Sequence, residues 1–98
     1  MADAGSPTGY VVIVPPQQMD RLTTVGFQTA VLAYDPNHTI IIDMTDVSFC
    51  DSAGVAALLS IATHASHGSS DVYLRRPSAL IIRLLEDAGV AGHFAVDS

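Results

Sequence analysis

The chain has 98 residues, 49% of them hydrophobic, and its four Lys and Arg face ten Asp and Glu, for a formal net charge of −6. A chain of this length builds one ordinary core, which excludes large two-domain enzymes. The acidic balance argues against nucleic acid and anionic membrane surfaces as partners. The single Cys50 cannot form an internal disulfide, and no apolar run approaches the roughly 20 residues that span a bilayer. We therefore expect a cytoplasmic protein without membrane insertion.

The N-terminal third begins with residues 1–9, which are small, polar and interrupted by glycine and proline. This composition predicts a flexible N-terminal segment ahead of a single domain over residues 10–98. Tyr10–Val14 is rich in β-branched residues and stops at a pair of prolines, so it is predicted to be a strand. From Gln17 to Tyr34 the apolar spacing is helical but irregular. Two faces compete there: Leu22, Val25, Gly26 and Thr29 on one, and Phe27, Val31 and Tyr34 on the other.

The middle of the chain opens with a turn composition at Asp35–His38, and Thr39–Asp43 is a continuous apolar run typical of a buried central strand. Residues 44–49 are expected to connect this strand to a helix that begins near Ser52. That helix is apolar around most of its circumference and is expected to end at Gly68–Ser70.

The C-terminal third predicts a strand at Asp71–Arg75, a helix at Ser78–Ala88 stopped by Gly89, and a short edge strand at His93–Val96. The inward stripe of that helix is expected to be Ile81, Leu84, Leu85 and Ala88. Strands thus alternate with helices along the chain, which predicts an α/β sandwich with a mostly parallel four-stranded sheet and helices packed on it.

A carboxylate and a hydroxyl lie side by side at Asp51 and Ser52, where a buried strand leads into a buried helix. Both residue types are preferred helix N-caps, so the pair could simply start the helix. Alternatively, Ser52 is displayed at a helix N-terminus, where N–H donors and the helix dipole favour a phosphate. A phosphate there would add about −1.5 to −2 units of charge.

Four segments, in this order and spacing, resemble STAS domains and, among them, bacterial anti-sigma factor antagonists. Met19–Thr23 resembles the Leu-Asp-x-x-Thr signature at the family's first helix, and Ile41–Phe49 resembles the central strand and its connection. Phe49–Val55 is similar to the family's phosphorylation loop, and Leu84–Val90 to the end of the third helix. The resemblance covers about residues 10–96 and implies the STAS sandwich.

The resemblance implies a regulatory binding module that is itself not an enzyme, needs no cofactor and holds no metal. In this family the serine after the aspartate is phosphorylated by a partner anti-sigma factor with serine kinase activity, and the unphosphorylated domain binds that partner. Ser52 would then be the phosphoacceptor, Asp51 and Asp20 nearby carboxylates, and Gly54 a point of close backbone approach. The implied partner-binding set is Asp20, Thr23, Asp51, Ser52, Ala53, Gly54 and Val55.

The chain also departs from the family pattern. Ala53 stands where many members carry a second hydroxyl, so Ser52 is the only acceptor in the loop. The fold is expected to be shortened at both ends, without the usual opening strand or a closing helix. Because an unpaired sheet edge invites pairing with another chain, a homodimer through that edge is a further hypothesis.

Other interpretations stay open. The chain could be a non-phosphorylated STAS subunit of a transport ATPase complex, which suits the abbreviated ends, or a STAS domain that binds a small ligand. Cys50 could be a nucleophile at the helix start, although a lone cysteine is more often a small buried hydrophobe. His64 and His67 could share a metal, but a zinc site normally takes at least three ligands.

Overall fold

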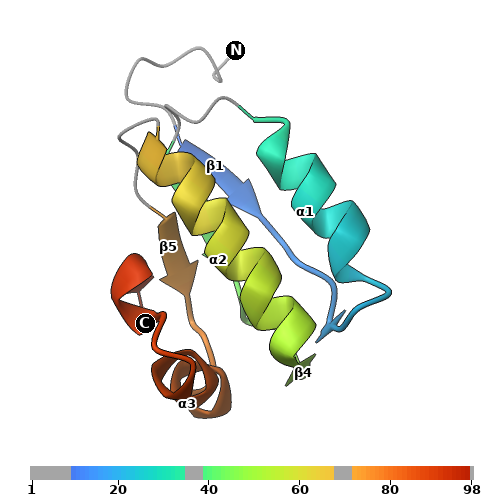
Figure 1. The fold of residues 1–98 in the computed structure, drawn as a ribbon, viewed down its shortest axis with the longest axis vertical. Helices are drawn as coiled ribbons and strands as arrows, with labels where there is room; N and C mark the ends of the chain where they lie inside the picture. The colour runs from blue at the N-terminus through green and yellow to red at the C-terminus, as the bar shows by residue number, and fades with distance from the viewer. Residues whose placement is uncertain (1–9, 35–38, 68–71, 98) are drawn as a thin grey trace.

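A computed structural model describes residues 10–34, 39–67 and 72–97. The segment 1–9, the predicted turn at 35–38 and the predicted helix end at 68–70 lie outside the described residues. The described parts form an α/β fold with a four-stranded sheet, as the alternation of strands and helices predicts (Figure 1).

Four parallel strands form the main sheet in the order β1-β3-β5-β6. They are β1 (Tyr10–Ile13), β3 (Thr39–Asp43), β5 (Val72–Arg75) and β6 (Ala95–Asp97). The parallel, mostly helix-connected topology confirms the predicted sheet. It also leaves β1 and β6 at the two edges.

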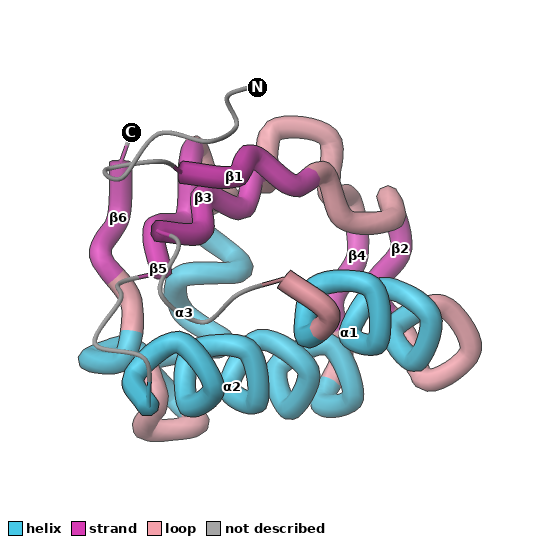
Figure 2. The backbone as a smooth tube through the Cα atoms, turned by 90° about the horizontal axis from the view of Figure 1, so that it is seen from above, coloured by secondary structure: helices cyan, strands magenta, loops and turns pink. Residues whose placement is uncertain are grey.

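The two faces of this sheet have different surroundings. Ile40, Ile42 and Leu74 are buried, whereas the alternate residues Ile41 and Tyr73 are only partly buried. Since successive side chains of a strand point to opposite faces, the core lies on one side of the sheet. Figure 2 shows α1 and α2 on one side of the four strands. The fully buried side chains of this core include Met19, Val31, Met44, Leu58 and Ile61.

Two of the three helices pack side by side on the sheet: α1 (Thr24–Leu32) and α2 (Ser52–His67) (Figure 1). The start of α2 at Ser52 matches the prediction. The helix expected from Gln17 to Tyr34 is wrong at its N-terminal end, because α1 begins only at Thr24. Of the two competing faces, the one with Phe27 and Val31 is buried and the one with Leu22 and Val25 is exposed.

A second, two-stranded parallel sheet pairs β2 (Gln18–Met19) with β4 (Phe49–Cys50). The sequence prediction placed the first of these segments in a helix and the start of the second in a connection, and both placements are wrong. A strand of two residues is too short to show a repeated alternation in the sequence, so its pairing follows from contacts between distant segments. This small ladder brings the start of α1 next to the start of α2.

The C-terminal part contains α3 (Ala79–Asp87), a 3-10 helix η2 (Ala91–His93) and β6. Gly89 has a φ of 75° and donates its N–H to Glu86, while Val90 donates to Leu85. This pair of bonds is the Schellman stop that ends α3 where the sequence predicted. The predicted last strand is displaced: His93 belongs to the 3-10 helix, and the pairing begins only at Ala95. On the predicted inward stripe, Ile81 and Leu85 are buried, Leu84 is half-buried and Ala88 is exposed.

Candidate functional site at the start of helix α2

The carboxylate of Asp51 caps α2. Its Oδ1 accepts the backbone N–H groups of Ala53 at 2.9 Å and of Gly54 at 3.2 Å. These are two of the donors that a helix leaves unpaired at its N-terminus. The carbonyl of Asp51 also accepts the N–H of Val55 at 3.0 Å, the first bond of the helix. Of the two residues that could have capped this helix, Asp51 does so.

Ser52 consequently occupies the first helical position rather than the cap. Its side chain is exposed, and its hydroxyl makes no hydrogen bond within the part of the chain that the structure describes. Ser78, at the start of α3, is the internal comparison, because its Oγ accepts the N–H of Ile81 at 3.2 Å. The hydroxyl of Ser78 is therefore engaged in a cap, whereas that of Ser52 is available for chemistry.

Gly54 lets the first turn of α2 lie directly against the β2–β4 ladder. A Cβ at this position would lie 2.6 Å from the Sγ of Cys50, 2.8 Å from the carbonyl oxygen of Met19 and 3.0 Å from the Cβ of Met19. The same carbonyl accepts the N–H of Asp51 at 3.2 Å. The missing side chain thus allows the close approach of the helix start to the ladder that the resemblance implied, and Gly54 lies within the first turn of α2.

Asp20 and Thr23 hold the neighbouring loop in place by reciprocal hydrogen bonds. The Oδ1 of Asp20 accepts the N–H of Thr23 at 3.0 Å, and the Oγ1 of Thr23 accepts the N–H of Asp20 at 3.0 Å. This is the reciprocal pattern of a capping box, with the acid first and the hydroxyl second. Thr23 also donates to the carbonyl of Gln18 at 2.5 Å. The Leu-Asp-x-x-Thr-like segment therefore ties β2 to the start of α1.

These two helix starts enclose a shallow hollow. Its lining residues come from the β2–α1 loop and from the first turn of α2: Asp20, Arg21, Leu22, Asp51, Ser52 and Ala53. The ladder register, which pairs Met19 with Cys50, sets the two loops side by side. Among the predicted site residues, Asp20, Asp51, Ser52 and Ala53 thus line one surface. Gly54 is buried beneath it, and Thr23 and Val55 lie outside its lining.

A second, mainly apolar groove begins at Ser52 on the other side and runs between α2 and α3. It is lined by Ser52, Val55, Ala56, Leu59, Leu84, Asp87, Ala88 and Val90. Val55 belongs to this groove, so the predicted set is divided between two adjoining depressions with Ser52 on their shared rim. Sequence reasoning missed Arg21, Leu22 and the groove residues of α3. The signal available for them was their place within two segments that resemble the family, Met19–Thr23 and Leu84–Val90.

The electrostatic setting of Ser52 is acidic. Asp20 and Asp51 line the hollow with it, and Asp87 lines the apolar groove; Arg21 is the basic residue of these linings. Any phosphate on Ser52 would therefore enter a surface that already carries carboxylates. A partner that contacts both depressions would meet negative charge next to an apolar strip.

Cys50 lies directly below this surface and is buried. Desolvation, with a smaller contribution from the charge of Asp51, raises the pKa of its thiol to about 11. A nucleophilic cysteine needs a thiolate near neutral pH, so this environment disfavours the nucleophile and supports a small buried hydrophobe.

Within residues 10–34, 39–67 and 72–97, no three His, Cys, Asp or Glu side chains gather as a metal site would require. His64 lies on α2, while the side chain of His67 is outside the described set. Over the same residues, no helix has the length and apolar character needed to cross a membrane.

The family model of the STAS domain matches residues 8–98, nearly the whole chain. The chain belongs to the STAS domain family. A comparison with curated proteins gives no match. STAS domains are regulatory or binding modules that are generally non-catalytic and act through protein–protein contacts. An exposed serine between a charged hollow and an apolar groove is consistent with such a role for this STAS domain.

Proposed function

We propose that this STAS domain is an anti-sigma factor antagonist that binds a kinase-type anti-sigma factor and is switched off by phosphorylation of Ser52. The observation that carries the proposal is the free hydroxyl of Ser52. It is exposed at the first helical position, and Asp51 performs the capping that a serine at a helix start often performs. A kinase can reach this hydroxyl without breaking a structural hydrogen bond.

The acidic setting explains how a phosphate would act as an off-signal. The unmodified surface offers a partner a neutral hydroxyl on the rim of an apolar groove. Phosphorylation adds about −1.5 to −2 units of charge beside Asp51, and docking would have to strip water from that charge. Because the cap does not involve Ser52, the modification changes charge and shape at the surface while α2 stays folded.

The test combines phosphorylation with partner affinity. We expect the wild type, incubated with ATP and the anti-sigma kinase of its host, to gain one phosphate at Ser52 by mass spectrometry. Ser52→Ala should accept none and bind the kinase as the wild type does, while Ser52→Glu should bind at least about tenfold more weakly. Equal affinity of Ser52→Ala and Ser52→Glu would refute the switch.

Ser78 supplies the matched control, because it also stands at a helix start but its Oγ is engaged in the cap of α3. Ser78→Ala should leave phosphorylation unchanged, and Ser78→Glu should leave kinase affinity unchanged. A pull-down from the host that recovers a transport ATPase in place of an anti-sigma factor with serine kinase activity would favour the non-phosphorylated transporter subunit instead.

A further inference from the structure

Among the described residues, strand β1 is an edge strand with unpaired backbone groups. In the described part of the chain it pairs with β3 alone, through the register from Tyr10 with Thr39 to Ile13 with Ile42. Half of its N–H and C=O groups therefore point away from the sheet. Such a row is a template for pairing with another strand, and monomeric proteins usually protect it with charge, proline or a bulge.

The side chains of β1 and the residue after it lack such protection. Tyr10, Val12 and Val14 are exposed at 63%, 44% and 65%, while Val11 and Ile13 on the alternate face are half-buried. The segment contains no charge, and the prolines follow only after it. A strand that is apolar on both faces is typical of the centre of a parallel sheet, yet this one lies at its edge.

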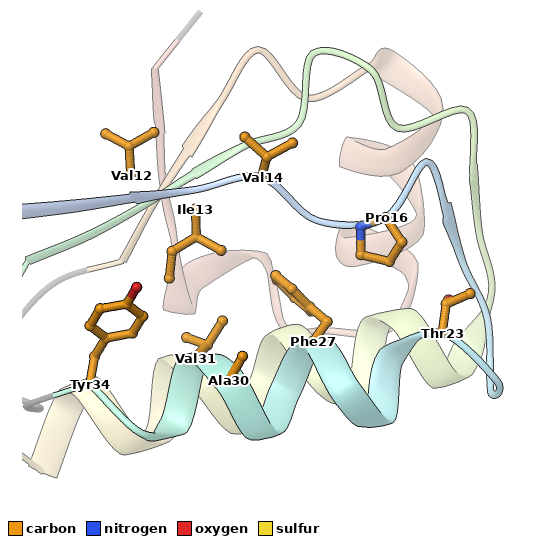
Figure 3. Close-up of a pocket in the computed structure, with 9 residues that line it drawn as sticks. All are labelled: Val12, Ile13, Val14, Pro16, Thr23, Phe27, Ala30, Val31 and Tyr34. Atoms are coloured by element: carbon orange, nitrogen blue, oxygen red, sulfur yellow. The ribbon is translucent and has the colours of Figure 1, made fainter.

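A groove lies directly beneath this edge, between β1 and α1 (Figure 3). Ile13 points into it from the strand, Phe27 and Val31 rise towards it from α1, and Tyr34 rises from just after that helix, whereas Val12 and Val14 point the other way. None of the residues that line the groove is charged. A strand added to β1 would place every second side chain over this groove, as in recognition by β-strand addition.

We propose that a second copy of this chain supplies that strand, so that β1 pairs antiparallel with its equivalent around a two-fold axis. An uncharged groove beside an uncharged edge selects an uncharged, β-branched segment. Residues 1–9 do not fit, because they carry Asp3, Pro7 and two glycines and no Val, Ile, Leu or aromatic residue. Tyr10–Val14 does fit, and a two-fold axis places this segment of one copy beside the same segment of the other copy.

This dimer is independent of the proposed phosphorylation switch. Ser52 does not line the β1–α1 groove, and none of the β1 residues lines the two depressions beside Ser52. Loss of one property therefore leaves the other intact, and the two can be tested separately.

The first experiment measures the mass of the full chain by sedimentation across a wide concentration range. We expect a monomer–dimer equilibrium, and Val12→Lys should raise its dissociation constant about fivefold, because two like charges would face each other across the paired strands on the side away from the groove. The matched control is Val96→Lys, which places the same charge at an exposed valine on β6, the opposite edge. This control should dimerise as the wild type does.

The second experiment does not depend on the folding of a lysine variant. Tyr10→Cys, Val12→Cys and Val14→Cys are each oxidised gently, and the residue nearest the two-fold axis should give a disulfide-linked dimer, while Val96→Cys should stay monomeric. The native Cys50 is buried with a raised thiol pKa and does not compete.

Several results would overturn the proposal: a wild type that remains monomeric at every concentration, a dimer that Val96→Lys dissociates but Val12→Lys does not, or cross-linking at position 96 alone. A monomer whose β1 amides are slow to exchange with solvent would also overturn it, because another part of the same chain would then cover the edge.

Discussion

The close approach of α2 to the β2–β4 ladder predicts that Gly54→Ala destabilises the fold. Its new Cβ would meet the Sγ of Cys50 at 2.6 Å and the carbonyl oxygen of Met19 at 2.8 Å. Neither contact can relax cheaply, since Met19 is fully buried and its carbonyl is bonded to the N–H of Asp51. Overpacking of this kind costs about 1–3 kcal/mol, and contact with backbone favours the upper end.

Gly26→Ala is the matched control. Gly26 also lies in a helix, α1, but a Cβ there would meet nothing within 4 Å. Both substitutions gain the helix propensity of alanine, about 1 kcal/mol, so the difference in unfolding free energy between the two variants isolates the steric cost at Gly54. We expect Gly26→Ala to be more stable than the wild type and to exceed Gly54→Ala by about 1–3 kcal/mol, towards the upper end, in urea unfolding. Equal stabilisation by both alanines would refute the close packing at the helix start.

Two further predictions concern the neighbours of Ser52. Asp51→Ala should lower the unfolding free energy by about 0.5–2 kcal/mol through loss of the α2 cap, whereas Asp51→Asn, which keeps an acceptor oxygen, should retain most of it; equal losses in thermal or urea unfolding would contradict the capping role. Cys50, with its pKa raised from 9.0 to about 11, should hold about 100-fold less thiolate at pH 8 than an unperturbed thiol and react correspondingly slowly with iodoacetamide; reaction of the folded protein as fast as in urea would contradict the burial.

The sequence was sufficient for the main sheet, for the starts of α2 and α3 and for the end of α3. These elements have strong local signals: a continuous apolar run at Thr39–Asp43, capping residues at Asp51 and Ser78, and a glycine that accepts positive φ at Gly89. For the helix ends, local sequence decides where the element begins or stops, because the hydrogen bonds of the caps join residues two to five positions apart.

The sequence was insufficient for the start of α1 and for the surface beside Ser52. Gln18 and Met19 lie in a stretch whose apolar spacing is helical. Their pairing with Phe49 and Cys50 depends instead on a contact between segments some thirty residues apart. The same long-range contact creates the hollow with Arg21, and the placement of α3 near the start of α2 creates the apolar groove. Periodicity cannot report either arrangement, since each depends on how distant segments meet.

Asp51 caps α2 and Ser52 does not, and this difference determines whether a phosphate on Ser52 would act through the fold or through surface charge. If Ser52 capped α2, a phosphate would rearrange the helix start, and binding and stability would change together. Asp51 holds both N–H groups itself, so a phosphate leaves the cap intact. Below Ser52, the close approach of Gly54 to Met19 holds the first turn of α2 against the β2–β4 ladder. Ser52→Glu should accordingly change partner affinity while its unfolding free energy stays within about 0.5 kcal/mol of the wild type. A large loss of stability in that variant would mean that phosphorylation acts through the fold and not through surface charge.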